Sequence, residues 1–182
     1  MDKVLANFSL YVMRTYAPFF EWFDKGRKEL GVVEELLVSL NREGKVHLHS
    51  PRLQIPDPPD CACVNRAGAQ VALEVAEVIC QDAARLNAQG HDVMRLWNPG
   101  DLAVHIAHRL GEKDKKTYHG GPYAETVACL FTDEPMLTVS QATSELNVQQ
   151  FGPFRQLTSG FLVFSYDPGT KSYPVIGLRF QQ

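Results

Sequence analysis

The sequence lacks most of the features that would place it at once in a functional class. Its formal charge is only -3 and its pI is about 6.1, so it has no basic surplus of the kind that marks a protein coating nucleic acid. No stretch approaches the roughly 20 apolar residues that a membrane span needs, and the N-terminus has no basic region followed by an apolar run. We therefore expect no membrane contact, and any contact with nucleic acid must come from a local patch.

Cysteine is scarce as well. Four cysteines are too few for a disulfide framework, and each sits in an apolar run, where a free thiol behaves as a small hydrophobe. They are Cys61, Cys63, Cys80 and Cys129. Cys61 and Cys63 follow His47 and His49, but their C-x-C spacing lacks the partners of a structural zinc site, which favours core packing. Free thiols indicate a reducing compartment, so we expect a cytoplasmic protein.

The common hydrolase and nucleotide-binding motifs are also missing. The chain contains no G-x-S-x-G, P-loop or G-x-G-x-x-G pattern, no internal repeat and no low-complexity tract. What it does have is an ordinary globular composition, with 182 residues that are 45% hydrophobic and 21% charged. That length fills one core. We predict a single domain over residues 1–182, divided into an aromatic helical extension at 1–28 and a core at 29–182.

Hydrophobic spacing predicts a mixture of helices and strands. The aromatic helix expected at 4–23 either packs against the core or forms a surface that binds a partner, such as a second copy of this chain in a homodimer. Asp101 is the expected N-cap of the longest later helix. Further helices are expected at 28–41, 81–88, 102–118 and 140–148, and strands at 46–50, 61–64, 70–79, 126–131, 160–166 and 173–180, with an extended proline-rich connector at 51–59. This order predicts an α/β fold with a central mixed β-sheet flanked by helices.

One carboxylate stands out in the apolar strand expected at 70–79. Side chains alternate along a strand, so Glu74 shares a face with alanines, while the opposite face carries valine and leucine. Burying it costs several kcal/mol unless it is paired or binds a cation. Asp60 heads the neighbouring strand, and two such carboxylates form a minimal Mg²⁺ site. Glu77 is a third candidate, although it falls on the opposite face.

The helix expected at 102–118 supplies basic groups. Lys113 continues the apolar stripe of that helix at helical spacing, so it is expected to point toward the sheet. His105, Arg109 and Lys116 recur at spacings of four and seven, which predicts a neighbouring stripe suited to a phosphate backbone. Lys113 and Asp60 also have simpler interpretations. A lysine near a helix C-terminus is favoured by the helix dipole, and an aspartate that follows two prolines often caps a turn.

The run Pro59-Asp60, followed by Leu73-Glu74-Val75-Ala76-Glu77, resembles the PD-(D/E)XK nuclease superfamily, in particular its small members. The resemblance covers about residues 29 to 131, and the expected hairpin at 161–178 is similar to that of some members. It implies a restriction-endonuclease-like core made of a helix, a three-stranded meander, a helix and a further strand.

The resemblance also implies roles for particular residues. Asp60 and Glu74 would bind the metal, assisted by an acidic residue of the preceding helix, Glu35 or Glu34. The family lysine two residues after Glu74 is replaced by Ala76. Some members supply that lysine from a neighbouring helix, which selects Lys113. A glutamine that follows the acidic strand in other members makes Gln81 a minor candidate.

Three hypotheses follow. The first is a Mg²⁺-dependent enzyme that hydrolyses phosphodiester bonds of DNA, rather than RNA, with Lys113 positioning the water nucleophile. The second is a protein that keeps the nuclease-like fold but has lost catalysis and binds a partner. The third is an unrelated α/β domain. The first two require the carboxylates of Asp60 and Glu74 to lie within about 4 to 6 Å of each other.

Overall fold

A computed structural model describes residues 24–42, 44, 47–91, 93–94 and 96–181. The helix expected at 4–23 lies outside this range. The described elements are α2 (Lys25–Arg42), β1 (Leu48–Leu53), β2 (Cys61–Asn65), β3 (Gln70–Glu77), α3 (Gln81–Ala88), α4 (Asp101–Asp114), β4 (Glu125–Thr132), α5 (Val139–Leu146), β5 (Ser159–Phe164) and β6 (Val175–Leu178). None of these helices combines the length and the apolar character that a membrane-spanning segment requires.

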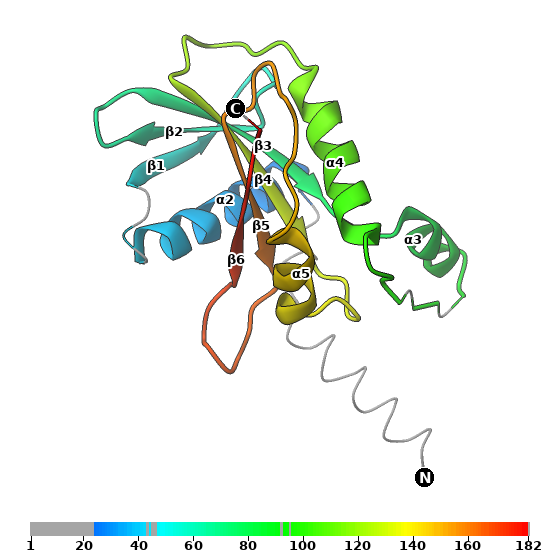
Figure 1. The fold of residues 1–182 in the computed structure, drawn as a ribbon. Coiled ribbons are helices and arrows are strands. Elements are labelled where there is room, and N and C mark those ends of the chain that lie inside the picture. The colour runs from blue at the N-terminus through cyan, green and yellow to red at the C-terminus, as the bar shows by residue number, and fades with distance from the viewer. Residues whose placement is uncertain (1–23, 43, 45–46, 92, 95, 182) are drawn as a thin grey trace.

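All six strands belong to one sheet in the order β1-β2-β3-β4-β5-β6 (Figure 1). Strands β1, β2 and β3 form an antiparallel meander. Strand β4 pairs parallel to β3 after the crossover through α3 and α4, and β5 pairs parallel to β4 after α5. Strand β6 closes the sheet as an antiparallel hairpin with β5. The predicted α/β fold with a central mixed sheet flanked by helices is confirmed.

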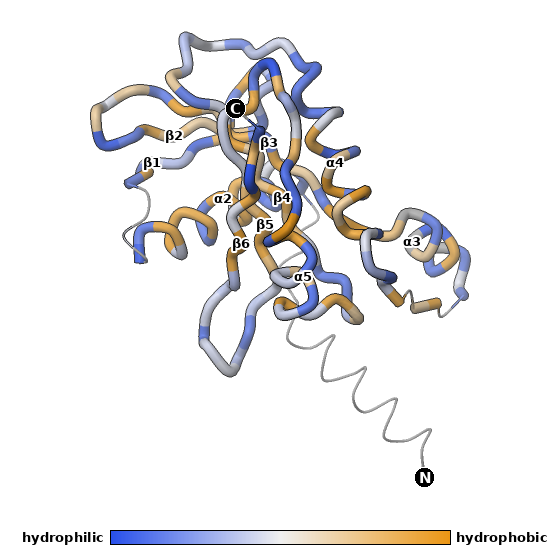
Figure 2. The backbone as a smooth tube through the Cα atoms, viewed as in Figure 1, coloured by the Kyte–Doolittle hydropathy of each residue, from blue (hydrophilic) through white to orange (hydrophobic). Residues whose placement is uncertain are grey.

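Helices cover both faces of the sheet. Helix α2 packs on one face, where its buried valines and leucines contact Val71, Leu73 and Val75 of β3. Helices α4 and α5 pack on the other face, against β4, β5 and β6. Figure 2 shows hydrophobic residues along α2 and the sheet, with hydrophilic residues in the loops. The four cysteines are free and buried, as expected of core thiols. Because β3 has a helix on each face, any polar side chain at its centre is removed from water.

Helix α2 and strand β1 have boundaries that differ from those expected from the sequence. Helix α2 begins at Lys25, so residues 25–28 form its first turn instead of belonging to an extension. Strand β1 continues through Pro51 to Leu53, where a connector was expected. Proline is tolerated there because β1 is an edge strand, and its pairing with β2 is irregular between His49 and Arg52.

Helix α4 starts and ends earlier than expected. Gly100, with φ of 92°, precedes it, and Asp101 is the first helical residue instead of the N-cap. The helix ends at Asp114, well before the glycines at 120 and 121. Its end is held by the segment before β5: the Asp114 carboxylate accepts backbone N–H bonds from residues 155–157 at 2.8 to 3.0 Å. In return, the Gln156 side chain donates to the carbonyl oxygens of Asp114 and Lys116.

We predict that Asp114→Asn destabilises the protein by about 1 to 2 kcal/mol at pH 7, because an amide offers one acceptor oxygen to three donors. Burial opposes ionisation of Asp114, but the three N–H bonds outweigh it and hold its pKa below the ordinary value. The stability from a lowered pKa is present above the unfolded-state pKa and is lost as pH falls through the folded one. Urea unfolding of both proteins from pH 7 to pH 3 should show the difference shrinking with acid; a constant difference would contradict the assignment.

Candidate functional site

Asp60 lies immediately before β2, at the point where the pairing of β2 with β3 ends. The last residue pair of that ladder is Cys61 with Leu73. Beyond this pair, the Asp60 side chain takes the place of a backbone acceptor from β2, because its Oδ2 accepts the N–H of Val75 at 2.7 Å. A buried N–H without an acceptor is costly, so this bond fixes the carboxylate against β3. The Asp60 side chain is 1% exposed.

Glu74 lies in the middle of β3 and is fully buried. Its neighbours Leu73 and Val75 point to the α2 face, so the alternation of the strand directs Glu74 to the α4 face. Strand β4 pairs on one side, with Ala128 in register with Glu74, and the ladder with β2 on the other side ends at the neighbouring Leu73. A carboxylate at this depth requires positive charge beside it.

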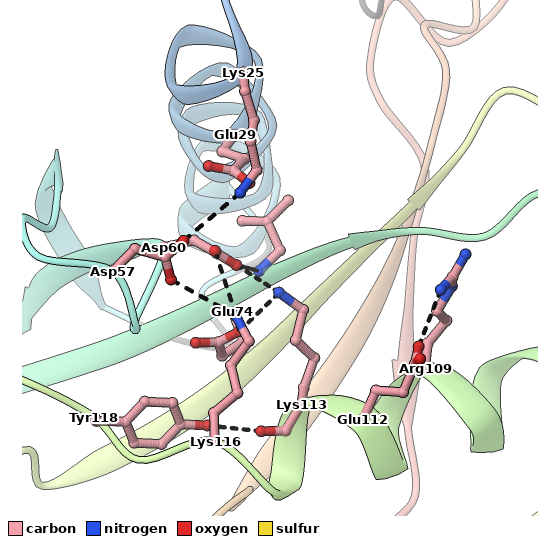
Figure 3. A network of polar contacts seen from close by, with 11 residues as sticks. Lys25, Glu29, Asp57, Asp60, Glu74, Arg109, Glu112, Lys113, Lys116 and Tyr118 are labelled. Atoms are coloured by element: carbon pink, nitrogen blue, oxygen red, sulfur yellow. Dashed lines mark hydrogen bonds and ion pairs between the residues drawn. The ribbon is translucent and has the colours of Figure 1, made fainter.

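Two lysines from the end of α4 provide that charge (Figure 3). The Nζ atom of Lys113 lies 2.7 Å from Asp60 Oδ2 and 2.7 Å from Glu74 Oε2. The Nζ atom of Lys116 lies 2.8 Å from Glu74 Oε2 and 3.7 Å from Asp60 Oδ1. The two buried carboxylates therefore face two ammonium groups, and the four charges balance.

The cluster opens toward solvent through Asp57 and the start of α2. Asp57, about half exposed, lies 3.7 Å from Lys116 and 3.6 Å from Lys25. Lys25 also pairs with Glu29 at 3.3 Å, one turn further along α2. Asp57, Asp60 and Glu74 each offer an oxygen within 4.8 Å of the others. The three carboxylates thus lie close enough to share one metal ion.

The electrostatics differ between the two buried carboxylates. Burial tends to raise the pKa of Asp60, but Lys113, the Val75 N–H and Lys116 together lower it below the ordinary value. For Glu74 burial dominates, and with the nearby charge of Asp60 it raises the pKa despite the two lysines. Burial and the charge of Asp60 also raise the pKa of Glu29. An added cation would favour the ionised forms of Glu74 and Glu29.

The donor set suits Mg²⁺, which prefers carboxylate oxygens together with water and phosphate oxygens. Glu74 Oε1 and Asp60 Oδ1 are buried and have no hydrogen-bond partner in the part of the chain that the structure describes. Buried polar atoms are nearly always satisfied, so these two oxygens have unused capacity to accept a ligand. The residues that would hold the ion are Asp57, Asp60 and Glu74.

The structure brings together four of the residues singled out in the sequence: Asp60, Glu74, Lys113 and Lys116. Lys113 reaches the sheet as its stripe predicts, alongside buried Leu102, Ile106 and Leu110. Lys116 arrives differently, because α4 ends at Asp114; the predicted basic stripe is therefore wrong for Lys116, while His105 and Arg109 lie within the helix at the predicted spacing.

The other candidates lie elsewhere. Arg109 pairs with Glu112 and donates to the carbonyl of Glu77, apart from the lysines (Figure 3). The Glu77 carboxylate pairs with Lys28 at 3.1 Å. Glu35 does not join the three carboxylates; its electrostatic neighbours are Glu34 and Tyr173. Gln81 begins α3, and its side chain is not among those that the structure describes.

Sequence reasoning missed Asp57, Lys25 and Glu29. The acidic residue of α2 beside the site is Glu29, about 9 Å along the helix axis from Glu35. A helix expected to start at 28 placed Glu29 in a fraying first turn and left Lys25 outside it. The i,i+4 spacing of Lys25 and Glu29 was a usable signal for an earlier start. Nothing in the spacing of the proline-rich loop indicates that Asp57 turns toward Asp60.

Comparisons with protein-family models, with curated proteins and with solved structures gave no match to this chain. The functional argument therefore depends on the chemistry of the site itself.

We predict that Lys113→Met lowers the free energy of unfolding by about 3 kcal/mol in the absence of divalent metal, because it leaves two buried carboxylates with one ammonium partner. Lys115→Met is the matched control: Lys115 is exposed at the end of the same helix, and its loss should cost less than about 0.5 kcal/mol. Urea unfolding at pH 7 in EDTA measures both. Equal effects of the two substitutions would show that Lys113 does not neutralise the buried pair.

Proposed function

We propose that this protein is a metal-dependent nuclease that hydrolyses phosphodiester bonds of DNA, built as a PD-(D/E)XK-like enzyme. The observation that carries the proposal is the convergence of Asp60 and Glu74 with Lys113 at 2.7 Å from both. Carboxylates for a divalent cation and a lysine beside them are the groups that phosphodiester hydrolysis needs. The lysine comes from a helix instead of the position of Ala76, as one variant of the superfamily pattern implies.

The order of elements supports the same proposal. Helix α2, the antiparallel meander β1-β2-β3, helix α4 and the parallel strand β4 occur in the order that the resemblance implies for the nuclease core, with the short helix α3 inserted between β3 and α4. In this arrangement Asp60 at the head of β2 and Glu74 in β3 come from adjacent strands. Rigid strands hold catalytic groups more firmly than loops do.

Each residue has a role in the proposed reaction. Asp57, Asp60 and Glu74 would hold the ion, which when bound lowers the pKa of water and stabilises charge on the phosphate. Lys113 orients the attacking water or the scissile phosphate through its ammonium group, since burial and the bond to Asp60 hold it in place. Glu29 and Lys25 line the exposed side, where they influence the charge that an incoming strand meets.

We propose DNA as the substrate. Its phosphate groups would approach the site from the exposed side, where lysines lie. There the ammonium groups of Lys25 and Lys116 remain partly exposed. These two lysines are the local basic group through which we propose that nucleic acid contacts this acidic chain. A homodimer and a cytoplasmic location stay predictions.

A binding protein without catalysis is the second candidate. It is favoured by the charge balance, since Lys113 and Lys116 neutralise Asp60 and Glu74 without any metal. In that case the cluster would hold the fold together as a buried ion network, and the chain would act through a partner.

We predict that the wild-type protein nicks supercoiled plasmid or single-stranded DNA with Mg²⁺ or Mn²⁺, and that EDTA abolishes the reaction. Glu74→Gln and Lys113→Met should each reduce the rate by at least about 100-fold, because each removes charge that acts on the transition state. Lys115→Met should retain the wild-type rate, and circular dichroism should show each variant folded. A wild-type protein inert with both metals, in both substrates, would favour the binding protein.

We further predict that Glu29, and not Glu35, influences the reaction. Glu29→Gln should lower the cleavage rate by about tenfold, because Glu29 interacts electrostatically with Asp60 and Lys113. Glu35→Gln is the matched control on the same helix and should leave the rate within about twofold of wild type. Initial rates over a Mg²⁺ titration distinguish a change in metal affinity from a change in turnover. A larger loss in Glu35→Gln would reverse the assignment.

A further inference from the structure

The two lysines of the site are not equivalent. Lys116 contacts three carboxylates: its Nζ lies 2.8 Å from Glu74 Oε2, 3.7 Å from Asp60 Oδ1 and 3.7 Å from Asp57 Oδ1. These are the three residues whose oxygens lie within 4.8 Å of one another and would hold a metal ion. The ammonium group of Lys116 therefore lies where positive charge is shared by the whole acidic group.

Lys113 contacts a different set of atoms. It bridges Asp60 Oδ2 and Glu74 Oε2 and donates a hydrogen bond to Asp60; within the described residues its ion pairs are with these two carboxylates and not with Asp57. Its side chain is 12% exposed, against 31% for Lys116. Lys113 lies in the last turn of α4, whereas Lys116 follows the helix. Lys113 is thus the more firmly enclosed of the two.

The charge balance limits what the site can accept. Asp57, Asp60 and Glu74 carry three negative charges and Lys113 and Lys116 carry two positive ones, so a divalent cation added beside both lysines would leave an excess of positive charge next to the buried carboxylates. The unsatisfied oxygens Glu74 Oε1 and Asp60 Oδ1 show that the carboxylates have unused ligand capacity. A cation can use that capacity at low electrostatic cost only if one lysine leaves.

Lys116 is the lysine able to leave. Its side chain is the more exposed, and two of its three contacts are at 3.7 Å. Its backbone is held, because the Gln156 side chain donates to the Lys116 carbonyl oxygen. Departure therefore requires a change of side-chain rotamer only, while Lys113 keeps its bond to Asp60.

We propose that Lys116 is a resident counterion that occupies the divalent-cation site and is displaced into solvent when the cation binds. The released ammonium stays at the mouth of the site, where it pairs with an incoming phosphate group. Metal binding and nucleic-acid binding are then coupled, each favouring the conformation in which Lys116 has left the carboxylates. This inference rests on the metal site of the proposed function, but not on cleavage.

The direct test is amine labelling of the full-length wild-type protein, read residue by residue by mass spectrometry, in EDTA and in a series of Mg²⁺ or Ca²⁺ concentrations. Labelling of Lys116 should rise severalfold with metal and saturate with the binding isotherm measured by calorimetry. Lys113 should stay protected throughout, and Lys115, exposed beside it, should be labelled equally with and without metal. Glu74→Gln should remove the metal response of Lys116.

Substitution gives a second, independent readout. Lys116→Met should bind Mg²⁺ or Ca²⁺ about tenfold or more tightly than wild type, a change of roughly 1.4 kcal/mol, because no ammonium has to be displaced. Lys115→Met should bind as wild type does. If metal affinity rose in Lys113→Met and not in Lys116→Met, then Lys113 would be the displaced lysine and the proposal would be overturned.

The outcomes separate the inference from the proposed function. Metal binding that depends on Glu74, without any change in Lys116 labelling, would overturn the counterion role and leave the metal site standing. Release of Lys116 by metal in a protein that cleaves no DNA would support the counterion role and overturn the nuclease. Absence of metal binding in the wild type and in Lys116→Met would overturn both.

Discussion

The carboxylate of Glu74, buried in the central strand of the sheet, is the constraint on which the rest of the site depends. Strand β3 has a helix on each face, β4 pairs with it on one side and the Asp60 side chain lies on the other, so Glu74 is fully buried. Its burial is tolerated because α4 delivers Lys113 and Lys116 to the same oxygen. The burial of Glu74 therefore depends on the two lysines at and just after the end of α4.

The end of α4 is in turn held by a distant part of the chain. Asp114 accepts three backbone N–H groups from residues 155–157, and Gln156 returns bonds to carbonyl oxygens at the helix end. This exchange stops the helix one residue after Lys113 and lets the chain turn so that Lys116 reaches the same carboxylates. The segment before β5 thus positions the lysines, although it contributes no side chain to the acidic group.

The sequence predicted the parts of the site that depend on periodicity. Glu74 was found because it breaks an apolar strand, and Lys113 because it continues the apolar stripe of α4. The alternation of β3 and the antiparallel pairing with β2 then placed Asp60 beside Glu74. Residues that depend on long-range contacts were not predictable: the early end of α4 requires residues 155–157, and the direction of Asp57 depends on a loop without a repeating pattern. Glu35 and Glu34 were named because the resemblance implies an acidic residue in this helix, whereas Glu29, which lies near the helix start at Lys25, was not considered.

A buried ion network is weak evidence for stability, because well-packed apolar residues of similar volume serve a core as well or better. The network here is also incomplete, since Glu74 Oε1 and Asp60 Oδ1 lack hydrogen-bond partners within the described chain. A purely structural cluster would gain by satisfying both oxygens. An acidic metal site has a different difficulty, because its carboxylates repel one another until the ion arrives. Under the proposed function, lysines that neutralise the carboxylates without filling every oxygen would let the chain fold before a metal binds, and this would account for the charge balance and the unused oxygens together.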